Sequence, residues 1–271
     1  MRLIPLSATF PPMIQMILVA AASFLAAAVN AVAGGGTFLT FPALTGVLGM
    51  NDKIANMTST IGLWPGSAAS IYPALSEFKR LPRGMLVFYS LISLAGGAIG
   101  AILLKTTSVA SFKLVIPWLL LLATVIFAFS KPIARWAGRG HGREHRSLMW
   151  TLGVGVIQFA VAVYGGYFGA GIGVLMLAGL SFVGLDHLNQ MNALKVLLAT
   201  MINGVASVIF LFSRERDSRV DWKVAFLMMI AAIIGGVVGM AWARRLKQEY
   251  LRAFILLVGV TLTAVYFWKN Y

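Results

Sequence analysis

Two long stretches without a charged side chain constrain this chain more than any other feature. No Asp, Glu, Lys or Arg occurs between Leu3 and Asn51, or between Leu148 and Leu185. A transmembrane helix needs about 20 apolar residues, so each stretch has about twice the length of one span. Each stretch must therefore cross a bilayer twice or fold back as a re-entrant hairpin.

The remainder of the chain divides into further apolar segments of the length of single spans. Six of them are predicted, at Ile54–Ser76, Gly84–Leu104, Leu114–Ser130, Leu188–Ser213, Val224–Ala243 and Ala253–Trp268. Charged residues make up only 11% of the chain, against roughly 25% in soluble domains, and no loop could hold a soluble domain. The prediction is an all-α polytopic membrane protein with about 8–10 membrane segments.

Composition removes several classes of function. The chain has no cysteine, which excludes disulfides, thiolate metal sites and cysteine nucleophiles. The histidines His141, His145 and His187 fall in predicted loops, so we expect no metal site, no catalytic residue and no cofactor. The net charge of +14 comes from short loops, where it anchors the chain to anionic lipid headgroups; we expect the lipid bilayer as partner and no nucleic acid.

Landmarks in the same order along two halves of the chain indicate an internal repeat. Asn56 pairs with Asn192, and three glycines in each half pair at a constant spacing: Gly96, Gly97 and Gly100 with Gly235, Gly236 and Gly239. The predicted boundaries are residues 1–135 for the first repeat, 136–147 for a basic linker and 148–271 for the second repeat. Each repeat has three spans and a broken stretch that crosses twice or, as a re-entrant hairpin, not at all. The number of crossings is odd in either case, so the second repeat starts on the opposite side of the membrane. The two repeats are therefore predicted to be inverted, as in many secondary transporters.

Glycines interrupt both uncharged stretches in their middle. They are Gly34, Gly35 and Gly36 in the first half, and Gly169, Gly171 and Gly173 in the second. Irregular backbone within a membrane is tolerated only where protein or a water-filled cavity covers it. A half-helix starting after each cluster, at Thr37 and around Ile172–Val174, would present free N–H groups to a small anion; close helix packing through glycine is the alternative.

The span after each broken stretch carries a polar stripe at helical spacing. The stripe of the first half is Asn56, Ser59, Leu63 and Ser67, and that of the second half is Asn192, Lys195, Ala199 and Asn203. A lysine within a membrane span costs roughly 2.5–3.5 kcal/mol on insertion scales and is usually functional. We therefore predict substrate binding by Asn56, Ser59, Asn192, Lys195 and Asn203 together with the glycine clusters and Thr37. A lysine that snorkels to the interface is the alternative for Lys195.

All eight acidic residues fall in predicted loops or at the ends of spans. They are Asp52, Glu77, Glu144, Asp186, Glu215, Asp217, Asp221 and Glu249. Cation pathways and proton relays generally use carboxylates inside the membrane, whereas this chain offers amides, hydroxyls, helix N-termini and a lysine. The selectivity that these groups predict is for an anion, whether transport is passive or is coupled through Lys195 or through a sodium ion bound by the backbone.

Both broken regions resemble a known family. The segments "NAVAGGGTFLTFPAL" and "ANMTSTIGLWPGSAAS" are similar to the first repeat of the sulfite exporter TauE/SafE-like permeases, and Tyr167–Ser207 is similar to the second. Asn192-Ala193-Leu194-Lys195 takes the place of a more compact Asn-Lys motif of that family. The resemblance implies a permease for small sulfur-containing anions, such as sulfite or sulfonates, in the prokaryotic cytoplasmic (inner) membrane. It leaves the anion, the direction and a homo-oligomer open.

Two other classes of protein remain as alternatives. A non-transporting membrane scaffold or assembly factor would use the polar stripes only to pack helices. An intramembrane enzyme or lipid-handling protein would need nucleophiles in the interior, and the sequence offers no convincing set. Basic residues give the orientation: twelve lie on one side, including Lys79, Arg83 and five between 131 and 146, against nine on the other. This predicts that the first set is cytoplasmic.

Overall fold

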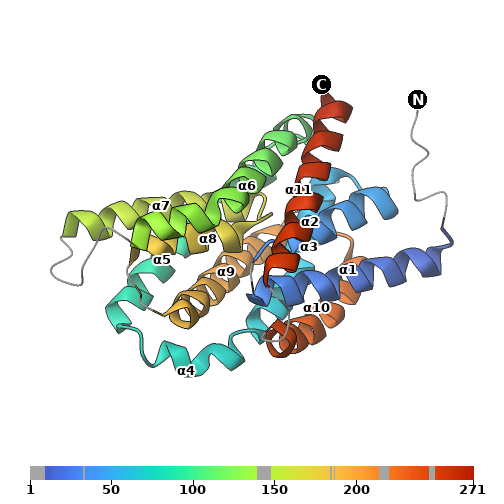
Figure 1. Cartoon of the computed structure of the whole chain (residues 1–271). Coiled ribbons are helices and arrows are strands. Elements are labelled where there is room, and N and C mark those ends of the chain that lie inside the picture. The colour runs from blue at the N-terminus through green and yellow to red at the C-terminus, as the bar shows by residue number, and fades with distance from the viewer. Residues whose placement is uncertain are drawn as a thin grey trace.

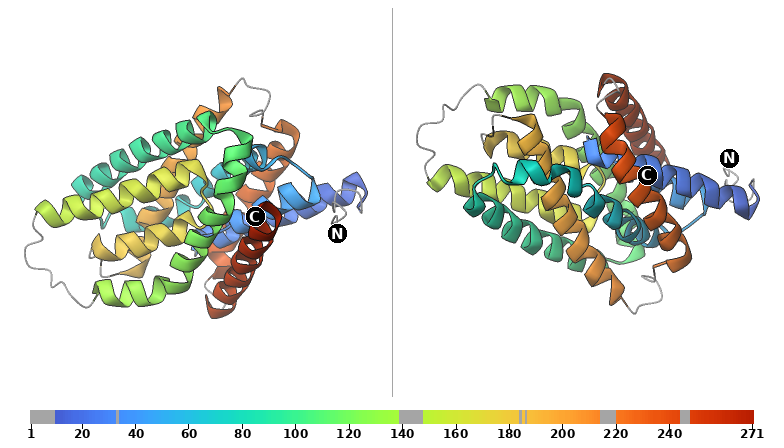
Figure 2. Two further views of the ribbon diagram at one scale, coloured as in Figure 1. Left: turned by 90° about the horizontal axis from the view of Figure 1, so that it is seen from above. Right: turned by 90° about the horizontal axis from the view of Figure 1, so that it is seen from below.

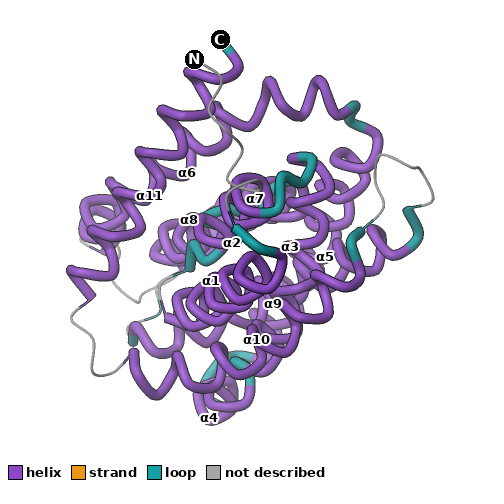
Figure 3. Tube along the Cα trace, turned by 90° about the vertical axis from the view of Figure 1, so that its right-hand side faces the viewer, coloured by secondary structure: helices purple, strands orange, loops and turns teal. Residues whose placement is uncertain are grey.

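A computed structural model describes residues 10–32, 34–138, 148–183, 185, 187–213, 220–243 and 248–271 of the chain. Throughout these ranges the chain is built from helices and loops, without a strand (Figure 3). Seven of the described helices are long and apolar enough to cross a membrane. The predicted class, an all-α polytopic membrane protein, is confirmed.

The long helices occur in two similar sets, one in each half. The first set is α1 (Pro12–Val32), α3 (Asp52–Ala69), α5 (Arg83–Thr106) and α6 (Val109–Gly138), and the second is α7 (Leu148–Tyr167), α9 (Leu188–Leu211), α10 (Trp222–Ala243) and α11 (Gln248–Asn270). Of these eight, only α3 is too polar to count among the seven candidate spans. Its residues are largely buried among the other helices.

Each uncharged stretch is a long helix followed by a short one. Behind α1 comes α2 (Thr37–Pro42), which continues as a π-helix (Ala43–Val47), and behind α7 comes α8 (Ile172–Leu180) with a 3₁₀ turn (Ser181–Val183). Eleven or twelve helical residues span about 16–18 Å, roughly half of the hydrocarbon core. The second arm of each stretch is therefore too short to cross the membrane.

Glycine allows the chain to turn between the two arms. Gly34 and Gly35 have φ of 77° and 105°, and Gly169 and Gly171 have φ of 74° and 73°. Side chains other than glycine rarely adopt these values because of the Cβ atom. The three-glycine run and its counterpart therefore break the helix, as predicted, at the same place in both halves.

Several predicted span boundaries differ from the observed helix ends, most of all those of α3 and α6. The span expected at Ile54–Ser76 ends as an α-helix at Ala69, and a 3₁₀ turn (Tyr72–Ala74) and the short helix α4 (Leu75–Phe78) follow. Pro73 accounts for this change, because proline cannot donate the next helical hydrogen bond. Helix α6 continues to Gly138, three residues into the predicted linker.

Helices of one half pack mainly against helices of the other half. α1 packs along α10 of the other half, and α7 packs along α5; α3 also packs against α10, as α9 does against α5. In Figures 1 and 2, α5 and α7 run side by side at one end of the molecule, and α1 and α10 at the other. α3 and α9 contact each other in the centre. This reciprocal packing is what two related repeats would produce.

The paired glycines have matching roles in that packing. A Cβ at Gly100 would meet the Val163 carbonyl oxygen of α7, and one at Gly239 would meet Ala28 of α1. The middle glycine of each set faces a different helix from the third glycine. Gly97 faces Ile202 of α9, and Gly236 faces the Gly66 carbonyl of α3. These glycines let two helix backbones approach closely.

Candidate functional site

The two glycine-broken regions meet at one point. A Cβ built on Gly34 would lie 2.5 Å from Gly173 Cα, and one built on Gly173 would lie 2.6 Å from Gly34 Cα. The backbones of the two halves are thus in direct contact here. The two clusters, which the sequence assigned to one substrate site, are therefore adjacent in the structure.

A cavity of about 30 Å³ lies beside this contact. It is lined by Asn30, Ala31, Gly34, Thr37, Thr60, Leu63, Ser67, Ser70, Gly169, Ile172, Gly173, Lys195, Val196, Ala199 and Asn203. A water molecule needs about 10–15 Å³ by this measure, so the cavity has room for roughly two. Lys195 is the one charged residue among these described lining residues.

Eight of the fifteen lining residues form four pairs that are 136 positions apart. The pairs are Thr37 with Gly173, Thr60 with Val196, Leu63 with Ala199, and Ser67 with Asn203. The C-terminal parts of both predicted polar stripes therefore face the same cavity, one from α3 and one from α9. The two members of each pair have different side chains. The two halves therefore contribute equivalent positions to the cavity lining but different polar groups.

Six of the twelve predicted site residues line the cavity, and six lie outside it. Those in the lining are Gly34, Thr37, Gly169, Gly173, Lys195 and Asn203. Those outside it are Gly35, Gly36, Asn56, Ser59, Gly171 and Asn192. The residues outside the lining contact the broken helices or form part of their turns.

Two backbone N–H groups in the first turns of the short helices have no acceptor among the described residues. Within the described part of the chain, no acceptor takes a hydrogen bond from the N–H of Thr37 or from that of Gly173. These two residues occupy related positions in the first turns of α2 and α8. The Gly36 N–H, in contrast, donates to Asn30 Oδ1 at 2.7 Å, so part of the α2 N-terminus is already satisfied by a side chain.

Lys195 is fully enclosed by protein. Its side chain is 1% exposed, and its Nζ donates to the Asn30 carbonyl oxygen at 3.1 Å. Asn30 lies in the last turn of α1, where carbonyl groups have no partner within the helix. The ammonium group therefore stabilises the negative end of α1 and lines the cavity at the same time; snorkelling to the interface does not describe its position.

Asn56 and Asn192 cap the two long helices of the broken stretches. Asn56 Nδ2 donates to the Tyr167 carbonyl at the end of α7 at 2.9 Å, and Asn192 Nδ2 donates to the Ala31 carbonyl at the end of α1 at 3.3 Å. The donors and the acceptors are both 136 positions apart. Each amide thus crosses from its own half to the other, and its position is that of a structural cap beside the cavity.

The remaining residues outside the lining make packing contacts. Ser59 Oγ lies 2.7 Å from Thr40 Oγ1 of α2. A Cβ at Gly36 would meet the Ala26 carbonyl of α1, and one at Gly171 would lie 3.1 Å from the Phe38 ring. At these glycines the packing interpretation fits the structure.

Sequence reasoning gave too little weight to three lining residues. Asn30, Thr60 and Ser70 line the cavity but are not among the predicted site residues. Thr60 and Ser70 extend the α3 stripe by one residue and by one turn, so a broader helical face would have included them. Asn30 carries no periodic signal, since its counterpart at position 166 is glycine.

Three other intramembrane polar and aromatic side chains donate hydrogen bonds away from the cavity. Gln158 Nε2 donates to Ser93 Oγ at 2.9 Å, which joins α7 to α5. Tyr164 donates to the Ala170 carbonyl at 2.7 Å, and Trp64 Nε1 to the Thr200 carbonyl at 3.1 Å. None of these three residues lines the cavity.

The described acidic residues lie at the ends of helices. Asp52 is the first residue of α3 and accepts a hydrogen bond from Tyr266 at 2.8 Å, and Asp221 precedes α10. Glu77 lies in α4, and Glu249 lies in the first turn of α11. Glu144, Asp186, Glu215 and Asp217 lie outside the described residues.

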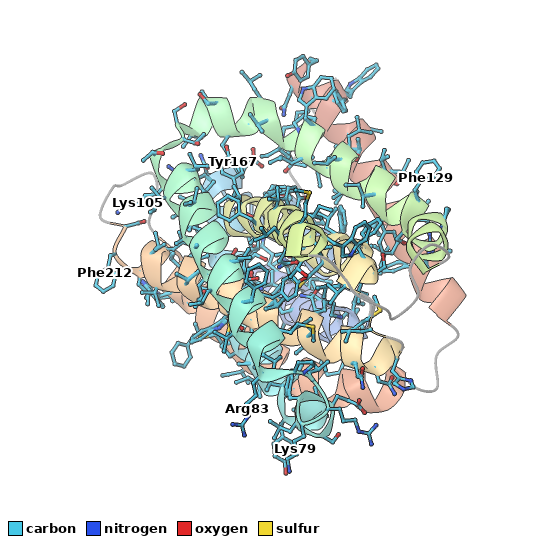
Figure 4. All side chains as sticks on the ribbon, turned by 90° about the vertical axis from the view of Figure 1, so that its left-hand side faces the viewer. Lys79, Arg83, Lys105, Phe129, Tyr167 and Phe212 are labelled. Carbon is cyan, nitrogen blue, oxygen red and sulfur yellow. The ribbon has the colours of Figure 1, made fainter. Side chains whose placement is uncertain are left out.

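The basic residues that the structure describes follow the predicted segregation. In Figure 4, Lys79 and Arg83 lie at one end of α5 and Lys105 at the other. Half of the larger basic set falls outside the described residues, namely Arg139, Arg143, Arg146, Arg244, Arg245 and Lys247. Which face is cytoplasmic remains a prediction.

The fold and the cavity define a class: a multi-pass membrane protein with a polar cavity, lined in part by a buried lysine, between helices from the two halves of the chain. A model of the family "Sulfite exporter TauE/SafE" matches residues 19–267. The chain belongs to this family, and it is a membrane transporter of the cell membrane. The resemblance found in the sequence is confirmed.

Curated relatives cover nearly the same length. A probable membrane transporter protein of Haemophilus influenzae is 28% identical over 89% of this chain and 90% of its own length. Probable membrane transporter protein ORF9 of a Sinorhizobium species is 24% identical, over 89% and 88%. Probable membrane transporter protein YfcA of Escherichia coli K12 is 25% identical, over 89% and 86%. No solved structure matches the chain.

Proposed function

We propose that this transporter carries small anions, with sulfur oxyanions such as sulfite and small sulfonates as the substrate class. The observation that carries the proposal is the buried ammonium of Lys195 in the cavity lining. An anion would meet this charge, the N–H groups of Thr37 and Gly173, and hydroxyl groups such as that of Ser67. Such charge-assisted hydrogen bonds are about twice as strong as neutral ones.

The size of the cavity bears on how transport would proceed. Its volume of about 30 Å³ leaves little space for an oxyanion, so the lining helices must move apart to admit one. Substrate sites of secondary transporters commonly lie between repeats that rock against each other. Here the cavity lies between α3 and α9, which belong to different halves.

The name of the family supports a sulfur-containing anion, and the names of the curated relatives support transport in general. A scaffold or an enzyme is not favoured by these comparisons. A pyramidal or tetrahedral oxyanion suits donors that converge from several helices, as they do at this cavity.

Replacing Lys195 by methionine tests the site. Met keeps an unbranched apolar stem but removes the charge. Loss of a charged hydrogen bond of 1.5–3 kcal/mol corresponds to a decrease of about 10- to 150-fold in the initial uptake of ³⁵S-sulfite by proteoliposomes. Unchanged uptake in Lys195→Met would refute the site.

Lys53 supplies a matched control. It is also buried, at 2% exposure, but its Nζ binds the carbonyls of Lys105 and Thr107 at the end of α5, away from the cavity. Lys53→Met should leave uptake per folded protein within about twofold. Melting curves with sulfite, thiosulfate, sulfonates and short carboxylates would rank the anions, because a ligand stabilises the state that it binds.

A further inference from the structure

The last helices of the two halves are joined near both of their ends. α6 and α11 pack along each other at one side of the molecule (Figure 3). Near the start of α11, Arg252 donates to the Ala128 carbonyl of α6 at 2.8 Å and to the Phe127 carbonyl at 3.0 Å. At the end of α11, Asn270 Nδ2 donates to the Lys113 carbonyl of α6 at 2.7 Å. The two helices are therefore antiparallel, with a polar contact at each end of the pair.

Proline explains why α6 offers acceptors at these two places. The helix contains Pro117 and Pro132, and proline has no N–H to donate to the carbonyl four residues earlier. Those carbonyls belong to Lys113 and Ala128, the same two that α11 binds. A backbone acceptor without a donor is costly in a membrane, so α11 supplies at both prolines what α6 lacks.

The α6–α11 pair also lies against both glycine turns. A Cβ on Gly35 would be 3.5 Å from Ile255 Cγ2 of α11, and a Cβ on Gly171 would be 3.3 Å from Ala123 Cβ of α6. Gly35 and Gly171 are related positions, 136 residues apart. Each turn leads into a short helix whose first turn borders the cavity. A movement of the α6–α11 pair would therefore reach both of these helices.

We propose that α6 and α11 move as one body during transport, and that Arg252 and Asn270 are the positioning residues that keep them together. The two glycine turns then shift together, so the two short helices reach or leave the anion at the same time. The common movement rests on the proposed function, whereas the pairing at the two prolines does not. The pairing is therefore tested without any transported anion.

The melting temperature of the purified full-length protein in detergent tests the pairing. Loss of the hydrogen bonds should lower it by about 5 °C in Arg252→Met and by about 3 °C in Asn270→Ala. Pro132→Ala gives α6 its own donor, so in that background Arg252→Met should cost at most about half as much. Pro117→Ala should reduce the effect of Asn270→Ala in the same way. Lys269→Met is the control, because this exposed neighbour should not affect melting.

A disulfide between the two helices tests the common movement. A Cβ on Gly259 of α11 would lie 3.5 Å from Thr124 Cβ of α6, within the range found in disulfides. Thr124 Oγ1 has no partner among the described groups, and the chain has no cysteine of its own. Thr124→Cys with Gly259→Cys therefore gives one defined crosslink. Uptake of ³⁵S-sulfite should agree within about twofold between the oxidised protein and the reduced protein, which is its control.

The same crosslink distinguishes a positioning role of Arg252 from a general effect on stability. Arg252→Met should lower uptake per folded protein by about 2- to 30-fold. Oxidation of the cysteine pair in this variant should restore most of the uptake, because the disulfide then holds the helices together. A residue that acts only through stability would leave uptake per folded protein unchanged.

Two results would overturn the proposal. One is a loss of uptake on oxidation that reduction reverses, because α6 and α11 would then separate during transport. The other is an equal loss of melting temperature in Arg252→Met and Asn270→Ala with and without the prolines, because the freed carbonyls would then not hold the pair. If the unaltered protein takes up none of the anions while the melting results hold, the proposed function is refuted and the pairing stands.

Discussion

The end of α1 and the end of α7 show how two related regions can be built alike and still do different work. An asparagine from the other half caps each helix, and a glycine turn follows each one. One further position decides the chemistry: it is a lysine beside α1 and a serine beside α7. Geometry is thus shared between the halves, and charge belongs to one of them.

The largest expected effect comes from a substitution that separates the glycine turns of the two halves. Gly34→Ala would place a Cβ 2.5 Å from Gly173 Cα, at a φ of 77°. Backbone cannot yield as a side chain does, so we expect a loss of about 4 kcal/mol or more, seen as aggregation in fluorescence-detected gel filtration. Gly46→Ala, where a Cβ meets nothing within 4 Å, is the control and should elute normally. Normal elution of both variants would contradict the close contact.

The second prediction concerns the two asparagine caps. Asn56→Ala and Asn192→Ala each leave one helix-end carbonyl without its donor, at a cost of about 1–3 kcal/mol. Because the two contacts are related, both variants should lower the free energy of unfolding by similar amounts, within about 1 kcal/mol, as measured by thermal melting. We expect a slightly larger loss for Asn56→Ala, whose hydrogen bond is shorter at 2.9 Å. A large effect of one variant and none of the other would show that the ends are not equivalent.

The smallest expected effect is at the paired cavity residues Ser67 and Asn203. Asn203→Ser makes the second stripe resemble the first at this position. Serine keeps one donor, so replacing the amide's hydrogen bond to the anion by that of a hydroxyl would weaken the apparent affinity by at most about tenfold, measured from the concentration dependence of sulfite uptake. Ser67→Ala should change it less, because a hydroxyl offers a single donor. A loss as great as that of Lys195→Met would assign the main role to the amide.

The sequence predicted which segments form the cavity region better than it predicted what each polar side chain contacts there. Uncharged length predicted the membrane class, and the glycine runs marked the breaks, because a membrane segment has few other reasons for three consecutive glycines. Helical spacing placed Lys195 and Asn203 on one face, and both line the cavity. The same spacing assigned Asn56 and Asn192 to the substrate, whereas both are caps in the structure.

Composition and periodicity alone determined that the chain is helical and crosses a membrane, and they predict an internal repeat and an interior with donors rather than carboxylates. These properties follow from the cost of placing polar and charged groups in hydrocarbon, which acts on every residue separately. Tertiary structure decided which donors reach the cavity and which reach a helix end. That choice depends on contacts between residues more than 100 positions apart, such as Lys195 with Asn30, and no local pattern records them.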